Sequence, residues 1–428
     1  MKGRVEAIIG AQWGDEGKGR VIDAFGDRFD IFARYQGGSN AGHTVIVDDK
    51  KYVFHSLPSG MLYHGKLCVI GNGVVLDPEL LLAEIKELQE RDMDRARLII
   101  SRAAHVVMPY HKILDKAQEN FRGKGFKIGT TGKGIGPCYV DKYTRSGLRL
   151  EDIINEHKLR SKLEGILEEK NMMLTRLYNE SPIAFSEVFN LARQWGRELS
   201  PYLADTGSQI NDAINNGKNV LLESTQGTLL DIDHGTYPYV TSSSPVSAGG
   251  CIGLGIAPTC IDGVLTVVKS YSTRAGEGPM PTEDNGEVGK HLRDIGGEYD
   301  TVTSKSRRCG WLDLVALCYS IRVNGAKAII LTKLDVLTGL DKIKYCVAYE
   351  VEGNLYHDFR SEVGFLSEAK PVFEEIPGWS EDISGCSKYE ELPSAAQNYL
   401  HIIEERCKIP ITFVGVGPKR HQLIDIKL

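Results

Sequence analysis

The chain opens with a strand-like segment that runs directly into a glycine-rich turn carrying three charged residues. Residues 5–10 read VEAIIG, a short apolar run typical of a fully buried strand, and the turn AQWGDEGKG (residues 11–19) follows it. From Lys18 on, KGRVIDAFG has the spacing of apolar positions expected for a helix. A strand, a glycine turn and a helix in this order predict the opening of an α/β fold.

The remaining apolar segments continue this alternation. We predict further strands at Ile31–Tyr35 and at residues 96–101, 219–224, 262–272 and 326–335. We also predict a helix after the N-cap and proline of Asp77-Pro78, and a helix within WLDLVALCYSIRVNGA (311–326) that ends at a glycine. Alternating strands and helices predict a mainly parallel central sheet flanked by helices. Residues 151–199 contain few glycines and read as a helical insertion or subdomain, within a single elaborated α/β domain over 1–428.

Composition restricts the classes of partner. The net charge of −6 argues against a nucleic-acid-binding surface, which needs a surplus of Lys and Arg. Nine cysteines without a CxxC pair fit neither a disulfide framework nor a zinc site, and no apolar run approaches the length of a membrane span. We therefore expect a cytoplasmic protein with reduced thiols that binds neither nucleic acid nor membrane.

The first glycine turn resembles a phosphate-binding loop but lacks one of its parts. In the common pattern GxxxxGK[ST], the final hydroxyl binds Mg²⁺, whereas Gly19 follows Lys18 here. Asp15 follows a glycine near the expected helix start, so it could be a simple N-cap. Alternatively, its carboxylate replaces the missing hydroxyl as a Mg²⁺ ligand and also serves as a base on a substrate N–H.

Glycines gather in six segments, all of which we expect at strand ends or in loops, including SAGGCIGLGIAP at residues 247–258. His43 lies in one of them, QGGSNAGHT, where the neighbouring glycines would let the backbone approach a ligand closely. A surface or hydrogen-bonded histidine is the ordinary alternative. Six such segments with polar residues between them favour a nucleotide site.

The segment AIILTKLD (328–335) indicates which nucleotide is bound. In GTP-binding proteins, [NT]KxD after a buried strand selects guanine, because the aspartate accepts hydrogen bonds from N1–H and the 2-amino group. Adenine lacks these donors and would leave the desolvated carboxylate unpaired. Lys333 and Asp335 match this arrangement, although TKLD at a strand end can also arise by chance.

Two basic segments allow two interpretations each. TSKSRRCGWLD places Lys305, Arg307 and Arg308 among hydroxyl side chains before a helix, which suits either a solvated charge run or the binding of a small dicarboxylate. Arg145 in DKYTRSGLR lies in either a surface turn or a phosphate clamp.

Eight motifs in matching order give the chain a resemblance to the adenylosuccinate synthetase family over nearly its whole length. These motifs are QWGDEGKG, NAGHT, GTTGKGIGP, QGTLLDIDHGTYPYVTSS, TRAGEGPMPTE, RRCGWLD, TKLD and VGVGPKR. The resemblance implies an enzyme that joins IMP to L-aspartate at the expense of GTP. The 6-oxo group of a purine leaves poorly until it is phosphorylated, so the implied route passes through 6-phosphoryl-IMP.

The resemblance also implies roles for particular residues. Asp15 would remove the N1 proton of IMP and His43 would act beside O6, so the implied catalytic residues are Asp15, His43, Lys18 and Gln226. The Asp15 carboxylate and the Gly42 carbonyl would hold Mg²⁺, and Arg145 would reach an IMP bound in the partner subunit of a homodimer. The implied GTP-binding residues are Gly14, Asp15, Glu16, Gly17, Lys18, Gly19, Arg20, Gly42, His43, Thr44, Arg307, Lys333, Leu334, Asp335, Gly415, Val416 and Gly417. Those for IMP are Asp15, Glu16, Gly17, Lys18, Asn40, Ala41, Gly42, His43, Thr131, Arg145, Gln226, Thr241 and Lys305. Those for aspartate are Thr301, Val302, Thr303, Ser304, Lys305, Ser306 and Arg307.

The chain departs from the family pattern where aspartate would bind. The family has threonines and a glycine followed by a run of arginines, whereas residues 301–307 read TVTSKSR. Lysine and arginine are not equivalent at a bidentate carboxylate site. Two alternatives therefore remain, a divergent paralogue that uses another purine nucleotide or amine, and a GTP-binding switch protein without ligase activity.

Overall fold

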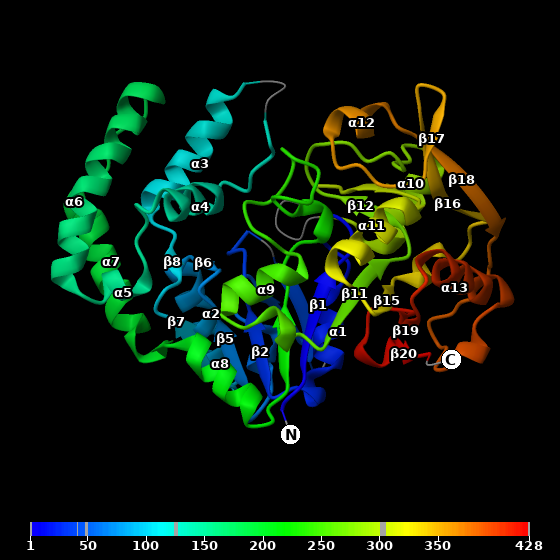
Figure 1. Cartoon of the computed structure of the whole chain (residues 1–428), viewed down its shortest axis with the longest axis horizontal. Helices are drawn as coiled ribbons and strands as arrows, with labels where there is room; N and C mark the ends of the chain where they lie inside the picture. The colour runs from blue at the N-terminus through cyan, green and yellow to red at the C-terminus, as the bar shows by residue number, and fades with distance from the viewer. Residues whose placement is uncertain (1, 41, 48–49, 124–126, 300–304, 427–428) are drawn as a thin grey trace.

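A ten-stranded sheet runs through the centre of the molecule (Figure 1). The computed structural model describes residues 2–40, 42–47, 50–123, 127–299 and 305–426. In spatial order the strands are β20 (Leu423–Asp425), β19 (Ile411–Gly415), β15 (Ala328–Thr332), β11 (Gly263–Lys269), β1 (Val5–Gly10), β10 (Val220–Glu223), β2 (Ile31–Arg34), β5 (Leu67–Ile70), β7 (Arg97–Ser101) and β9 (Leu203–Ala204). All neighbours pair in parallel except β19 and β20, which confirms the predicted mainly parallel sheet.

The strands of the sheet are apolar because both of their faces are covered. In β1, Val5, Ala7 and Ile9 belong to a core cluster on one face and Ile8 to a cluster on the other, and all are fully buried. Buried parallel strands need such continuous apolar runs, which is why these segments could be predicted.

Thirteen α-helices lie in the described part of the chain. They are α1 (Lys18–Ala24), α2 (Pro78–Glu90), α3 (Pro109–Phe121), α4 (Ile135–Thr144), α5 (Leu150–Ile153), α6 (Glu156–Met172), α7 (Phe185–Leu199), α8 (Thr206–Asn215), α9 (Ser247–Leu254), α10 (Glu287–Gly296), α11 (Leu314–Asn324), α12 (Val363–Glu368) and α13 (Ser394–Cys407). The predicted cap of α2 is confirmed, since the Asp77 side chain accepts a hydrogen bond from the Leu80 N–H. The predicted glycine stop of α11 is also confirmed, with Gly325 in the left-handed conformation.

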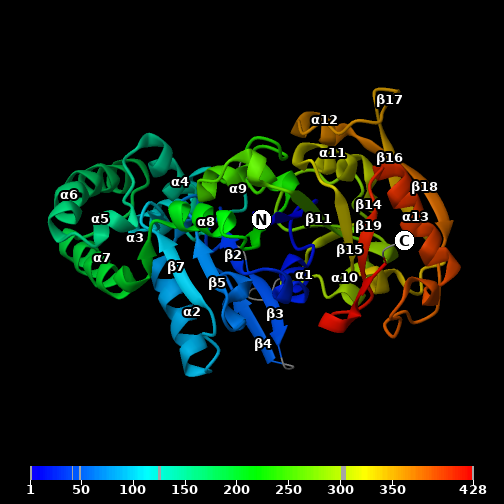
Figure 2. The ribbon, with the colours of Figure 1, turned by 60° about the horizontal axis from the view of Figure 1, so that its bottom comes forward.

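Smaller strand pairs lie outside the central sheet. They comprise β3 (His43–Val47) with β4 (Lys50–Phe54), β6 (Val75–Leu76) with β8 (His105–Val106), β12 (Ser272–Arg274) with β13 (Arg308–Gly310), and a second sheet of β14 (Leu312–Asp313), β16 (Lys342–Val351), β17 (Asn354–Tyr356) and β18 (Lys370–Pro377). Helices α3, α5, α6 and α7 gather at one end of the molecule and β16, β18 and α13 at the other (Figures 1 and 2).

One glycine-rich segment does not form the loop that we expected. Residues 247–254 are helix α9, and its glycines allow close packing rather than chain reversal. A Cβ at Gly253 would lie 2.0 Å from the Tyr35 carbonyl oxygen, and one at Gly249 would lie 2.1 Å from that of Ser244. The prediction of a loop was wrong because small residues on a helix and in a turn look alike in sequence.

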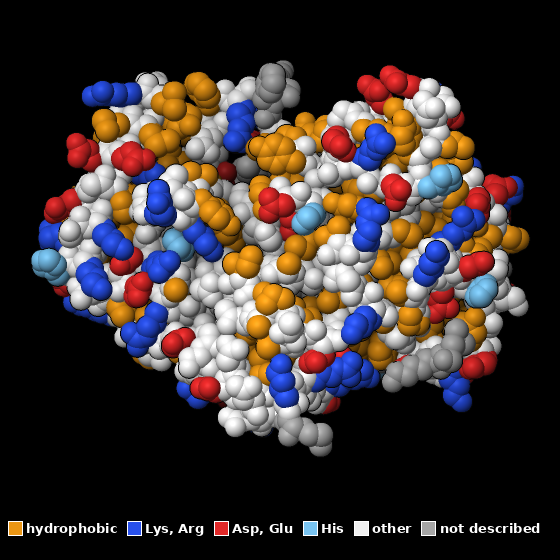
Figure 3. All heavy atoms as spheres, viewed as in Figure 1, with side chains coloured by type: hydrophobic (Ala, Val, Ile, Leu, Met, Phe, Trp, Pro, Cys, Tyr) orange, Lys and Arg blue, Asp and Glu red, His pale blue; other side chains and the backbone are white. Residues whose placement is uncertain are grey.

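The strand order places the candidate site. From β1 the chain builds the sheet toward β2, β5 and β7, and after β10 it builds toward β11, β15 and β19 on the other side. The turn after β1 therefore lies where the order reverses, and ligands of open α/β sheets bind at the carboxyl ends of the strands at such a point. The space-filling view shows the molecule notched at the corresponding edge (Figure 3).

Candidate active site

The turn between β1 and α1 is built from left-handed residues. Gly14, Asp15 and Gly17 have φ angles of 84°, 60° and 87°, and Gly17 is the N-cap of α1. Glycine adopts this conformation freely, and aspartate tolerates it better than most residues do. The backbone N–H groups at the start of α1 are directed at this turn, as in an anion-binding loop.

Glu16 braces the turn from within. Its fully buried carboxylate accepts hydrogen bonds from the Gln12 and Gly14 N–H groups, both at 3.0 Å. It also forms an ion pair with Lys18 at 2.6 Å. Lys18 also donates to the carbonyl oxygen of Gln226. The Glu16 side chain therefore shapes the loop, while its carbonyl accepts a hydrogen bond from the Thr332 hydroxyl.

Asp15 is not a helix cap, because α1 begins after Gly17. Its side chain is 36% exposed, and its carboxylate forms an ion pair with the Arg307 Nε at 2.8 Å. A non-glycine residue held at positive φ with an accessible carboxylate is the kind of strained position found at functional sites. Of the two interpretations of Asp15 made from the sequence, the structure excludes the one in which it is the N-cap of the helix.

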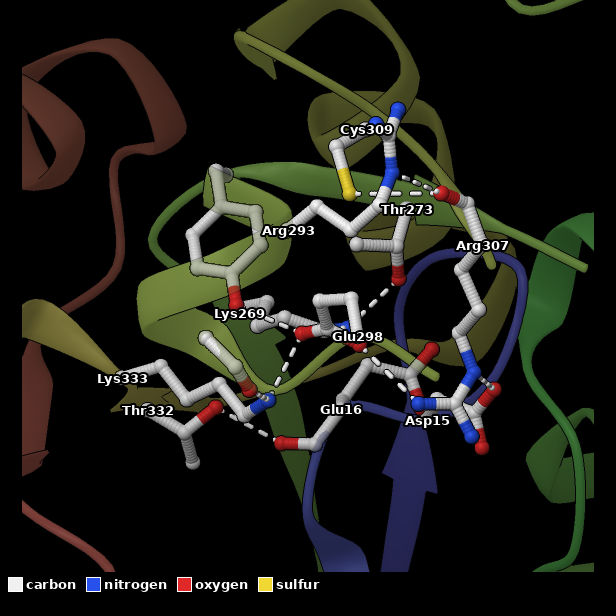
Figure 4. Close-up of polar contacts among 12 residues, drawn as sticks. Asp15, Glu16, Lys269, Thr273, Arg293, Glu298, Arg307, Cys309, Thr332 and Lys333 are labelled. Atoms are coloured by element: carbon white, nitrogen blue, oxygen red, sulfur yellow. Dashed lines mark hydrogen bonds and ion pairs between the residues drawn. The ribbon is translucent and has the colours of Figure 1, made fainter. Parts of the chain in front are cut away.

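Arg307 is in turn held by a buried carboxylate, Glu298, through its Nη1 at 3.1 Å from Glu298 Oε2 (Figure 4). The other oxygen, Oε1, accepts from Lys269 at 2.9 Å, Tyr271 at 2.5 Å and Lys333 at 2.6 Å. Burial by itself would raise the pKa of Glu298, but the Lys269 and Lys333 ammonium groups hold it well below its ordinary value. The carboxylate is therefore ionised at neutral pH.

The TKLD segment lies beside the turn. The Thr332 hydroxyl donates a 2.6 Å hydrogen bond to the Glu16 carbonyl, and Lys333 adopts a left-handed conformation with φ 59°. Burial raises the pKa of Asp335, and its Oδ1 is buried with no hydrogen-bond partner among the described residues. A buried acceptor without a partner is costly, so this oxygen suits the N–H donors of a ligand.

Arg20 and the turn after β19 complete this part of the site. Burial lowers the pKa of Arg20 to about 10, and the charge of Asp335 opposes the shift. A Cβ at Gly415 would lie 3.1 Å from the Arg20 Nη1 and 3.3 Å from the Thr332 Cα. Arg20 thus lies in the same region as five other predicted GTP-binding residues, Leu334, Asp335, Gly415, Val416 and Gly417.

The loops after β2 and β10 meet on the opposite side of the turn. Gln226, with φ 58°, donates from Nε2 to the Asn40 Oδ1 at 3.3 Å and accepts from the Thr225 hydroxyl at 2.7 Å. A Cβ at Gly14 would lie 3.6 Å from the Gln226 Cα. Thr241 is half-buried, and its N–H is bonded to the Leu230 carbonyl in the same loop. The structure therefore unites Asn40 and Gln226, two residues implied for IMP.

Two further predicted residues lie before and after helix α4 in the chain. Thr131, before the helix, and Arg145, its left-handed C-cap, are both exposed. Tyr139 in the helix accepts from the Gly37 N–H at 3.0 Å and donates to the Gly73 carbonyl at 2.8 Å. The bond to Gly37 joins α4 to the loop that contains Asn40, and the bond to Gly73 joins it to the turn after β5.

Part of the predicted set lies outside what the structure describes. Ala41, Thr301, Val302, Thr303 and Ser304 are outside the described residues, and His43 and Thr44 are described only through the backbone of β3. Gly42, Lys305 and Ser306 are exposed.

Sequence reasoning missed Glu298, Lys269 and Tyr271. The one available signal was Lys269, a charged residue at the end of the apolar run GVLTVVK, where a lysine is costly unless it is paired. Glu298 follows a helix in an ordinary polar segment and gave no signal.

Comparison with known proteins agrees with this geometry. The model of the family described as adenylosuccinate synthetase matches residues 7–424. The chain belongs to the adenylosuccinate synthetase family. Family members join IMP and L-aspartate with GTP in AMP biosynthesis.

Members of the adenylosuccinate synthetase family from bacteria resemble the chain along its length. The enzyme of Pelotomaculum thermopropionicum is 50% identical over 417 residues, which are 97% of each chain, and that of Thermobifida fusca is 48% identical over 98% of each. The fully ligated adenylosuccinate synthetase structure from Plasmodium falciparum superposes with a TM-score of 0.93 at 42% identity, over 99% of this chain and 100% of the other.

A cyanophage S-2L succinoaminodeoxyadenylate synthetase, solved with dGMP and dATP, has a TM-score of 0.64 at 19% identity, over 100% of this chain and 97% of that one. This likeness concerns the fold alone. None of the helices in the described ranges of the chain is long and apolar enough to cross a membrane.

Proposed function

We propose that the chain converts IMP, L-aspartate and GTP into adenylosuccinate, GDP and phosphate through 6-phosphoryl-IMP. The observation that carries this proposal is the left-handed Asp15, whose accessible carboxylate lies outside the helix and against Arg307. A protein that only binds GTP needs no base at this position, whereas removal of the IMP N1 proton does. This argues against the switch protein.

Asp15 acts on the purine and Lys18 on the phosphate. When Asp15 takes the N1 proton, the electron pair makes O6 the nucleophile toward the γ-phosphorus, and the bond to the β-phosphate oxygen breaks. His43 acts beside O6. The α-amino group of aspartate then attacks C6 and expels phosphate. The N–H groups at the start of α1 and the Lys18 ammonium bind phosphate oxygens and offset the charge that develops on them.

The residues present fit a magnesium ion. Mg²⁺ is commonly bound by one or two protein oxygens together with substrate phosphates, and the Asp15 carboxylate offers an accessible oxygen donor. We propose Asp15 and the Gly42 carbonyl as its protein ligands. When bound there, the ion would supply positive charge that offsets the negative charge of the phosphate groups.

Asp335 selects guanine by accepting hydrogen bonds from N1–H and the 2-amino group. Its buried Oδ1, which has no hydrogen-bond partner in the described part of the chain, supports this role, and the Arg20 charge beside it favours the ionised carboxylate. Lys333, Leu334 and the Gly415–Gly417 turn contribute the remaining contacts to the base.

IMP occupies the opposite side of the turn. Its proposed contacts are Asn40, Gln226, Thr131, Thr241 and the 40–43 loop, and Arg145 from a partner subunit binds the 5′-phosphate. The exposure of Arg145 at the end of α4 supports a homodimer, in which this charge would be buried against a ligand. We place the protein in the cytoplasm, where this metabolism occurs, and regard residues 151–199 as a helical insertion in one domain.

Aspartate binds at the 301–307 segment, with Arg307 and Lys305 facing its carboxylates. The alternative of a paralogue that uses another amine or another purine nucleotide rests on the lysine at position 305. An absorbance assay with GTP and Mg²⁺ separates the possibilities when IMP and other purine nucleotides are each tested with a panel of amino acids. We expect turnover only with IMP and aspartate. Turnover with a different amine or nucleotide would support the paralogue, and slow GTP hydrolysis that is independent of IMP would support the switch protein.

A further inference from the structure

Glu298 and Arg307 are joined through both their main chains and their side chains. The Arg307 N–H donates to the Glu298 carbonyl at 2.9 Å, and Tyr299 and Ser306 form an isolated antiparallel bridge next to it. The Arg307 carbonyl accepts from the Arg293 Nε at 3.1 Å. This backbone pairing fixes the Cα position of Arg307, and the Glu298 carboxylate then decides the direction of its guanidinium.

The two oxygens of Glu298 serve two different parts of the site. Oε2 accepts from Arg307, and Oε1 accepts from Lys333, which also donates to the Gly296 carbonyl at 2.7 Å. Figure 4 shows both contacts converging on the same carboxylate, from the segment before β13 and from the end of β15. Arg307 follows Glu298 by nine positions in a local backbone pairing, whereas Lys333 is 35 positions from Glu298 and is brought to it by the fold.

Arg307 is held at two edges of its planar guanidinium. Its Nε bonds Asp15 at 2.8 Å and its Nη1 bonds Glu298 at 3.1 Å, an arrangement that a lysine could not reproduce. Glu298 is fully buried and has three cationic neighbours, so the cluster keeps a positive surplus even when Asp15 is included. Such a surplus suits anionic substrate groups next to it.

We propose that Glu298 is a positioning residue that orients Lys333 toward the guanine base and Arg307 toward Asp15 and the amino-acid carboxylates, and thereby couples the two subsites. This inference rests on the proposed function. Glu298 itself touches no substrate, because its carboxylate is enclosed by the four side chains that it binds.

Replacing Glu298 with glutamine tests the role with little change in volume. The amide has one acceptor oxygen and a nitrogen that only donates. If the oxygen stays with Lys269, Tyr271 and Lys333, the NH₂ group faces the Arg307 guanidinium and releases it. If the amide is reversed, the Lys333 contact is lost. In either case at least one subsite loses its orientation.

The experiment measures KM for each substrate and the melting temperature of E298Q in the full-length protein. We expect KM for aspartate, KM for GTP, or both, to rise by about ten- to a hundredfold, the effect of a misplaced binding group, while KM for IMP stays near the wild-type value. The matched control is E283Q, since Glu283 binds the neighbouring Arg308 through two 2.9 Å contacts without touching Asp15 or Lys333. We expect its three KM values to match those of the wild type.

A double variant separates positioning from general stability. If Glu298 acts through Arg307, R307K should raise KM for aspartate, and adding E298Q should raise it no further. Wild-type values of KM for GTP and aspartate in E298Q, or equal rises for all three substrates together with a lower melting temperature, would overturn the inference. So would additive effects on KM for aspartate in the double variant.

Should E298Q fail to fold, Y271F removes only the hydroxyl that shares Oε1 with Lys333. It should raise KM for GTP by a few-fold, and an unchanged value would overturn the inference. A wild-type protein without IMP-dependent turnover would instead count against the proposed function.

Discussion

The Thr332 hydroxyl donates a 2.6 Å hydrogen bond to the Glu16 carbonyl, and this contact joins the TKLD segment at the end of β15 to the turn after β1. The two residues are 316 positions apart in the chain. Because Glu16 also holds the Gln12 and Gly14 N–H groups, the contact sets the position of the TKLD segment, which we propose reads the base, relative to the turn after β1, which we propose binds phosphate.

Thr332→Val removes this bond while keeping the shape of the side chain. We expect a rise in KM for GTP of about tenfold and a loss of about 1–3 kcal/mol in stability, because a buried carbonyl loses its partner. Steady-state kinetics and urea unfolding measure the two effects. Thr266→Val in neighbouring β11 is the control: this buried hydroxyl has no hydrogen-bond partner among the described residues, so its loss should be neutral or stabilising. Equal effects of the two variants would contradict the proposed link.

Asp15→Asn tests the base without changing the backbone. Asparagine also tolerates a φ of 60°, so the turn should keep its conformation. We expect kcat to fall by about 10²–10⁴-fold, the usual contribution of a general base, while calorimetry shows GDP binding close to that of the wild type. Product formation at the normal rate would show that another group removes the proton.

Asp335→Asn should change the base that is accepted. An amide offers a donor where guanine also presents donors, so KM for GTP should rise by about a hundredfold. Xanthine has an oxo group in place of the 2-amino group and should be used better by the variant than by the wild type. Rates with GTP, XTP and ATP provide the measurement. A variant that keeps its preference for GTP would show that the base is read elsewhere.

Lys305→Arg concerns the amino-acid substrate. Arginine offers a planar pair of donors to a carboxylate, so we expect KM for aspartate to fall several-fold while KM for GTP and IMP stay unchanged. Lys370→Arg at the exposed first residue of β18 provides a control with the same chemical change. An unaltered aspartate dependence would mean that Lys305 does not face that substrate.

Asp313 should make stability depend on pH. Burial raises the pKa of this α11 N-cap from 3.8 to about 6. Between these values the folded state keeps a proton that the unfolded chain has lost, so this group's contribution to stability declines as the pH rises, by on the order of 3 kcal/mol in total. An asparagine at this position would cap the helix equally well without ionising. Asp313→Asn should therefore stabilise the protein above about pH 6 and have little effect near pH 4 in urea unfolding.

The exposed N-cap Asp205 of α8 supplies the matched comparison. Its charge is solvated in both states, so Asp205→Asn should give no comparable gain in stability at high pH. A similar gain at both caps would mean that burial of Asp313 is not the cause.

Local signals identified elements whose cause is local. The apolar run of β1, the Asp77 cap of α2 and the Gly325 stop of α11 each depend on a few adjacent residues. The glycines of α9 led to the wrong prediction of a loop. They allow close packing against the backbone of Tyr35, which is distant in the chain and therefore absent from any local stretch of sequence.

The sequence by itself determined the alternation of strands and helices, the glycine turn with Asp15, and the TKLD segment, since periodicity and residue chemistry act over short stretches of chain. Only the tertiary structure decided that Asp15 lies outside the helix, that Arg307 holds it, and that Glu298 joins Arg307 to Lys333. Those contacts form between segments that are brought together when the sheet is assembled, and a carboxylate gives no sign in the sequence of which distant cations will surround it.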